Sequence, residues 1–177
     1  MMFEIDVSGD DMFNLNYTIC IASKDKIGGK SIIKGFRIPE ELKQTLIEKW
    51  KQNKYRYYYD VLEKRRGLFK VRIYCIIIYY LFKSLDIKEK ISLTICKDFF
   101  GRKRTINQSL KFLLEEKGGM KIGKPLHQKL HPSSLAHWYA GMMAKDSENR
   151  LDTYVNITLE DTEKFLKGLP QQEISLV

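Results

Sequence analysis

Hydrophobic and polar residues alternate over the first forty positions in three stretches typical of β-strands, residues 2–8, 13–23 and 31–38. Turn-forming residues separate these stretches, Gly9-Asp10-Asp11 in the first gap and a segment with two glycines, residues 26–30, in the second. Because short turns of this kind join neighbouring strands as hairpins, the pattern predicts an antiparallel three-stranded meander.

The hydrophobic spacing becomes helical after Pro39, which suits the first position of a helix and is followed by two acidic residues. This pattern continues to residue 62, and Gly67 interrupts it. The next apolar stretch, residues 68–85, has the Ile and Tyr content of a buried strand but the length of a buried helix. Its length favours a helix.

The second half of the chain is expected to alternate between strands and helices. Residues 91–96 form a β-rich run that predicts a buried central strand. The segment Thr105-Ile106-Asn107-Gln108 has the spacing of a capping box, and Gly118-Gly119 can end the helix that it starts. The remaining expected elements are a short strand at 120–126, a helix from Pro132 to about residue 145, an edge strand at 154–157 and a helix from Thr158.

This order of elements predicts an α/β fold with a mixed sheet and helices on its faces. A chain of 177 residues with 44% hydrophobic content can bury one core, so we expect a single domain over residues 1–177. Its core spans about residues 2–145, and a small C-terminal addition covers about 154–169.

The charge balance favours a polyanionic partner, because 31 Lys and Arg against 22 Asp and Glu give a net charge of +9. Nucleic acid and an anionic membrane surface both fit, and a thermophile-like surface rich in Lys and Glu is the alternative without such a partner. The longest apolar run, residues 73–82, is much shorter than the roughly 18 residues of a membrane span. We therefore expect nucleic acid and no membrane.

The cysteines Cys20, Cys75 and Cys96 are widely spaced in apolar surroundings and form no Cys-x-x-Cys pair. They predict buried thiols in a reducing compartment, with neither disulfides nor a zinc site. The first residues lack the basic and apolar regions of a secretory signal, so a cytoplasmic location is expected.

Two acidic residues are candidates for a metal site. Asp6 lies inside the first predicted strand, either on a solvated sheet face or as a carboxylate held within the sheet. Asp98 closes the predicted strand 91–96, where a single acid is also ordinary for a loop. If these strands are neighbours, the two carboxylates meet at one edge of the sheet, and oxygen ligands suit Mg²⁺ or Mn²⁺.

The opening Ile5-Asp6-Val7-Ser8-Gly9-Asp10, followed by a hairpin, and the acid Asp98 after the fourth strand resemble the ribonuclease H-like superfamily. The chain is most similar to poorly characterised members that open with Asp-Glu-Ser-Gly, and the element order agrees over about residues 2–145. The resemblance implies a five-stranded mixed sheet with helices on both faces, and it implies Asp6 and Asp98 as metal ligands. Val7 stands where the resembling group has a second acid.

The resemblance also implies a third ligand from the late helix, where the resembling group has an Ala-Asp pair. Here His137 takes the place of the acid, on a face with Ser134 and Gly141, whose small side chains permit close approach to the sheet. His137 is a candidate ligand or proton donor, and a histidine bonded within a helix–sheet interface is the alternative. Asp11 and Asp146 are candidates for the missing metal ligand.

Basic residues mixed with aromatic ones occupy two segments, residues 49–59 and 99–104. Such mixtures suit single strands, because cations follow the phosphates while rings stack on bases. In the first segment the alternative is that the tyrosines pack on the core. The second follows Asp98 directly and is expected to hold the scissile phosphate. The expected nucleic-acid-binding residues are Lys54, Arg56, Arg102, Lys103 and Arg104.

These features predict a divalent-metal-dependent nuclease with Mg²⁺ or Mn²⁺, in which two ions, if both bind, lie roughly 4 Å apart. Single-stranded nucleic acid is the expected substrate, with DNA favoured and exonucleolytic attack included. The alternatives are a non-catalytic nucleic-acid-binding protein on the same fold and a protein-interaction subunit. Motifs for nucleotide loops, zinc proteases and serine hydrolases are absent, and the oligomeric state stays open, a dimer included.

Overall fold

The computed structural model describes residues 1–13, 16–27, 29–57, 59, 63–97, 99 and 101–167. In this part of the chain five strands form one mixed sheet with the order β3-β2-β1-β4-β5. β1 is antiparallel to β2 and parallel to β4, which places it at the centre and confirms the predicted meander and mixed sheet. The strands are β1 (Met2–Ser8), β2 (Thr18–Ile27), β3 (Lys30–Arg37), β4 (Ser92–Ile95) and β5 (Leu126–His127).

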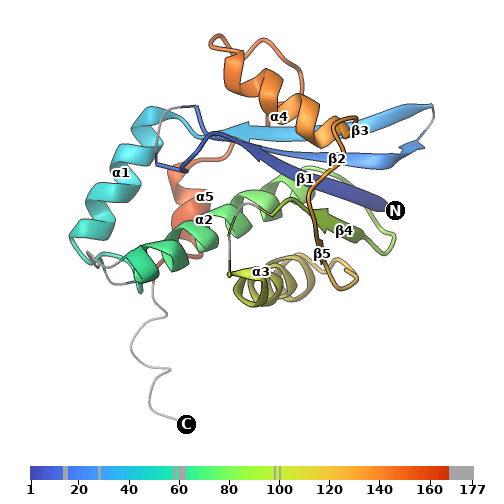
Figure 1. Ribbon diagram of the computed structural model, residues 1–177. Helices are drawn as coiled ribbons and strands as arrows, with labels where there is room; N and C mark the ends of the chain where they lie inside the picture. The colour runs from blue at the N-terminus through green and yellow to red at the C-terminus, as the bar shows by residue number, and fades with distance from the viewer. Residues whose placement is uncertain are drawn as a thin grey trace.

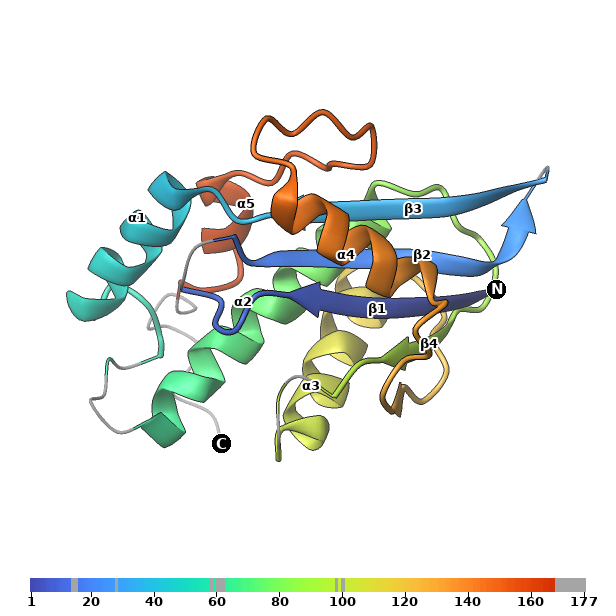
Figure 2. The ribbon, with the colours of Figure 1, turned by 45° about the horizontal axis from the view of Figure 1, so that its top comes forward.

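Helices cover both faces of the sheet, as the element order predicted. Figure 1 shows one face covered by α2 (Glu63–Lys83), α3 (Lys103–Leu110) with its π-helical continuation η1 (Lys111–Lys117), and α5 (Leu159–Glu163), while α1 (Glu40–Lys51) lies beyond the ends of the strands. On the opposite face α4 (Leu135–Lys145) lies across β3, β2 and β1 (Figure 2). The central strand β1 is therefore enclosed between α2 and α4.

Successive residues of β1 point to opposite faces of the sheet. Phe3 and Ile5 are fully buried in the main core, where the Phe3 ring packs edge-on against Phe82 of α2 with 5.0 Å between ring centroids. The alternation places Glu4 and Asp6 on the other face, under α4. One face of β1 thus stabilises the fold while the other carries two acids.

The apolar stretch 68–85 lies largely in α2, and residues 71–82 are all buried. The prediction of a helix, which rested on the length of this stretch, is therefore confirmed. Neither α2 nor any other helix in the described residues is long and apolar enough to cross a membrane.

The predicted end of the first helix was wrong. α1 ends at Lys51, where Asn53 adopts a left-handed backbone with φ of 53°, and α2 then runs without a break through Gly67. Gly67 has a packing role instead, because a Cβ there would lie 3.0 Å from a guanidinium nitrogen of Arg102. The glycine lets the start of α3 approach α2 closely.

The predicted capping box at Thr105 was also wrong. α3 begins two residues earlier, at Lys103, and its N-cap residue Arg102 makes no side-chain cap bond. The predicted stop is confirmed, since η1 ends at Lys117 and Gly119 has a left-handed φ of +67°.

The later strands are shorter than expected, and the last helix is as predicted. The segment 120–126 contributes a bridge from Ile122 to Ile91 before β5, and the edge strand 154–157 is reduced to a bridge from Tyr154 to Gly35. Thr158 starts α5 with a capping box, as the sequence indicated.

Small residues allow α4 to pack closely on the sheet, but Gly141, which we expected among them, does not contribute. The buried residues of α4 are Ala136, Ala140 and Met143, and a Cβ on Gly35 of β3 would overlap the Met143 sulfur. A side chain on Gly141 would meet nothing within 4 Å, so Gly141 does not contact the sheet as we had expected.

Candidate functional site

Asp6 occupies the centre of the α4-facing side of the sheet and is only 2% exposed. Its cross-strand neighbour on β2 is Cys20, a free and fully buried thiol. Burial, and next the charge of Asp6, raise the pKa of Cys20 to about 12. Cys20 is therefore a protonated thiol at neutral pH.

His137 reaches Asp6 from the first turn of α4. The Ser134 hydroxyl caps the helix by accepting the backbone N–H of His137 at 3.3 Å, which fixes where the histidine leaves the helix. His137 Nδ1 lies 2.7 Å from Asp6 Oδ2, and the His137 side chain is 60% exposed. A buried carboxylate thus holds one nitrogen of an imidazole that is open to solvent.

This pairing gives the site two groups with chemical capacity. Hydrogen bonding at Nδ1 fixes the orientation of the ring, and Nε2 then points away from Asp6. A histidine held in this way is suited to binding a metal ion or to exchanging a proton with a substrate.

A complete metal site is not formed by the described residues. Within them, no group of three or more His, Cys, Asp and Glu side chains is arranged to hold an ion. Asp98, the other expected ligand on the sheet, lies outside the described residues. Asp6 and His137 therefore fit a divalent ion only together with at least one further ligand.

The other candidate ligands are engaged elsewhere. Asp11 forms an ion pair with Lys70 of α2, on the face opposite α4, and accepts the backbone N–H of Phe13 at 2.8 Å. Asp146 accepts the backbone N–H of Leu151 at 3.1 Å after the end of α4.

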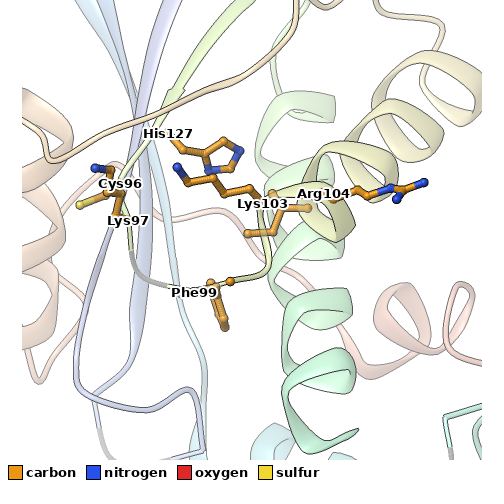
Figure 3. Close-up of a pocket in the computed structure, with 8 residues that line it drawn as sticks. Cys96, Lys97, Phe99, Lys103, Arg104 and His127 are labelled. Atoms are coloured by element: carbon orange, nitrogen blue, oxygen red, sulfur yellow. The ribbon is translucent and has the colours of Figure 1, made fainter. Parts of the chain in front are cut away.

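A cavity of about 380 Å³ opens beside the end of β4. Figure 3 shows its walls, which come from β4 on one side, α3 on the other and β5 above. Among its lining residues are Cys96, Lys97, Phe99, Lys103, Arg104 and His127. The cavity wall is joined to β1 through the β1–β4 ladder, because the Cys96 backbone N–H bonds the Ile5 carbonyl at 3.0 Å, but the cavity lies on the α3 side of the sheet whereas Asp6 faces α4.

The three consecutive cations expected to bind nucleic acid point in different directions. Arg102 lies against Gly67 of α2. Lys103 extends from α3 toward His127, whereas the Arg104 guanidinium points away from both (Figure 3). Of the three, Lys103 is therefore the side chain that reaches into the cavity.

His127 contributes an imidazole to the same cavity from β5. Its Nε2 lies 2.7 Å from Asn107 Oδ1 of α3. Burial, and next the charge of Lys103, lower the pKa of His127 below its ordinary value. The ring is therefore neutral at neutral pH, and Lys103 is the cation whose charge acts on it.

The other basic segment serves the packing of the chain. Tyr55 is buried and stacks on Phe69 with 5.6 Å between ring centroids, so its ring is not available to a base. Arg56 donates to the Phe165 carbonyl at 3.2 Å and lies over the Tyr57 ring. Lys54 is exposed in the same loop.

Two features of this region were not identified from the sequence. Glu4 is buried beside Asp6 on the same face and is paired with Lys24 at 2.9 Å, and the two-residue period of β1 would have indicated this position. Lys97 in the cavity follows the predicted central strand directly, but one lysine at a strand end carries no distinctive signal.

Comparisons with protein-family models, curated proteins and solved structures found no match. The likeness to the ribonuclease H-like superfamily therefore stays a resemblance, carried by the order of elements and by Asp6 on the first strand.

Proposed function

We propose that this protein is a divalent-metal-dependent nuclease that hydrolyses phosphodiester bonds in single-stranded nucleic acid. The observation that carries the proposal is Asp6, a buried carboxylate on the central strand that is bonded to the exposed imidazole of His137. Withdrawing a carboxylate from water is unfavourable unless charged or hydrogen-bonding partners compensate, and such groups concentrate at functional sites. The resemblance supplies the class of reaction.

Each residue has a distinct part in the proposed reaction. Asp6 and Asp98 would hold the ion, which when bound would supply charge neutralisation at the phosphate and a more acidic water. Lys103 and Lys97 bind the phosphate oxygens with their ammonium groups. His137 Nε2, which points away from Asp6, donates a proton to the leaving oxygen.

Trp138 supports a single-stranded substrate. It follows His137 on α4 and is 63% exposed, which is unusual for the largest apolar side chain. An exposed ring one residue from His137 can stack on an unpaired base, and the bases of a duplex are not accessible in this way.

Non-catalytic binding of nucleic acid is the second candidate. It is favoured by the incomplete ligand set among the described residues together with the two lysines at the cavity. A protein of this kind would bind single strands in a salt-sensitive way and leave them intact.

The deciding experiment incubates the protein with end-labelled single- and double-stranded DNA and RNA in Mg²⁺, in Mn²⁺ and in EDTA. We expect cleavage of a single-stranded substrate that EDTA abolishes and that Asp6→Asn abolishes as well. Asp152→Asn is the matched control, because Asp152 is exposed and loses the same charge.

Cleavage that survives EDTA would contradict metal dependence, and normal cleavage by Asp6→Asn would contradict the role of Asp6. Salt-sensitive binding without cleavage in any metal would select the second candidate.

A further inference from the structure

The cavity at the end of β4 combines cations with an apolar surface. Lys103 extends across it toward His127, and Lys97 lies at the end of the strand that forms its opposite wall (Figure 3). Phe99 and Ile106 supply apolar surface, and no Asp or Glu is among its described lining residues. The chemistry matches a ligand with an anionic end and a less polar body.

The size of the cavity excludes the smallest anions as complete occupants. Its volume of about 380 Å³ falls within the range of small-molecule sites, roughly 300–1,000 Å³. A lone phosphate group would satisfy the lysines but leave most of this space, including the apolar surface, filled with water. A nucleotide supplies the phosphate and also a sugar and a base.

The walls of the cavity favour the end of a nucleic-acid strand over its middle. β4, α3 and β5 bound the cavity on three sides (Figure 3). A continuous strand needs an entry and an exit, whereas a chain end needs one opening. The positive end of the α3 dipole also lies at this cavity and adds to the potential of the lysines.

We infer that this cavity binds the terminal nucleotide of a single strand, with the terminal phosphate held by Lys103 and Lys97. The identity of the ligand rests on the proposed function. A nucleic-acid strand held by its terminal nucleotide would be cleaved from that end. The strand would have to pass the end of β4 to bring a phosphodiester to Asp6, which faces α4 on the neighbouring strand β1.

The test measures affinity for short single strands of one sequence that carry a 5′-phosphate, a 3′-phosphate or hydroxyl groups at both ends. Measurements in EDTA at fixed salt prevent cleavage. We expect one terminal phosphate to tighten binding about tenfold, the usual effect of hydrogen bonds to a charged group. Lys103→Ala should remove that difference, Lys103→Arg should keep it, and Lys164→Ala, an exposed lysine of the C-terminal segment, should also keep it.

A competition experiment distinguishes a nucleotide from inorganic phosphate as the ligand of the cavity. Adenosine monophosphate should displace the phosphorylated strand at lower concentration than inorganic phosphate does, while adenosine should not displace it. Equal affinity for the three strands, or an undiminished difference in Lys103→Ala, would overturn the inference. Equal competition by inorganic phosphate would overturn the nucleotide assignment. Because binding is read in EDTA, absence of nuclease activity would leave these results unaffected.

Discussion

Asp6 Oδ2 and His137 Nδ1 lie 2.7 Å apart, although 131 residues separate them in the sequence. The bond connects the central strand to the first turn of α4. It joins the buried Asp6 carboxylate to the His137 imidazole, whose side chain is 60% exposed. The buried carboxylate orients the accessible imidazole. Carboxylates position histidines that bind metals or transfer protons in the same way. The acid and the helix that the sequence had linked only by resemblance are therefore in direct contact.

Replacing the imidazole should separate its chemical role from its structural one. We expect His137→Ala to lower the cleavage rate by about 10²–10⁴-fold, the range for losing a positioned proton donor. The free energy of unfolding should fall by only about 1 kcal/mol, because water can replace the exposed ring at Asp6. Rate assays and denaturant unfolding measure the two effects.

The matched control is His131→Ala, since His131 is exposed and bonds Ser133 locally at 2.7 Å. Equal rates for His137→Ala and the unaltered protein would assign His137 to the helix–sheet interface alone.

The fold was largely predictable because its elements carry regular hydrophobic periods. β1 matches the two-residue period of a strand, the apolar stretch of α2 has the length of a helix, and packing then needs only the order of the elements. The errors lie where tertiary contacts overrule local signals. Asn53 ends α1 through its backbone conformation, and Gly67 continues a helix because Arg102 packs on it.

Metal binding should be visible as a gain in thermal stability, because an ion that binds only the folded state stabilises it by mass action. At Mg²⁺ or Mn²⁺ about 100-fold above its Kd, we expect the Tm to rise by about 5–10 °C. The rise should shrink in Asp6→Asn and persist in Asp152→Asn. Differential scanning calorimetry with and without metal gives the answer, and an equal rise in all three proteins would place the ion elsewhere.

The directions of the cations predict unequal contributions to binding. Lys103→Ala should weaken binding to single strands of every sequence, because phosphate contacts carry no sequence information. The slope of log affinity against log salt should become shallower by about 0.7 for the lost contact. Arg56→Ala, which alters an arginine bonded to the Phe165 carbonyl, should change this slope little. A larger effect from Arg56→Ala would move the nucleic-acid path to the α1–α2 loop.

Less of the candidate site than of the fold could be predicted from the sequence. Asp6 was identified as a candidate by its place on a strand and His137 by the resemblance, but neither indicates that the two bond to each other. The cavity was missed as a unit because β5 is only two residues long, so nothing in the sequence shows that His127 lies opposite Lys103.

The last prediction concerns the pH dependence of stability at His127. Burial and the charge of Lys103 lower the pKa of His127, so the unfolded chain binds a proton more readily than the folded protein does. Stability contributed by the neutral ring is therefore fully present above pH roughly 6.5, the ordinary histidine value, and is lost as the pH falls through the folded pKa.

We expect the Tm of the unaltered protein to fall between about pH 7 and pH 5 more steeply than the Tm of His127→Gln, which keeps a partner for Asn107 but cannot take up the proton. His131→Gln should match the unaltered protein. The comparison with His127→Gln isolates this ring, because the other titratable groups are common to both proteins. A bound terminal phosphate would offset the charge of Lys103 and favour protonation of His127, so phosphorylated strands should make the decline shallower. If the Tm of His127→Gln and of the unaltered protein fell in parallel with pH, protonation of this ring would not affect stability. His127 would then only line the cavity.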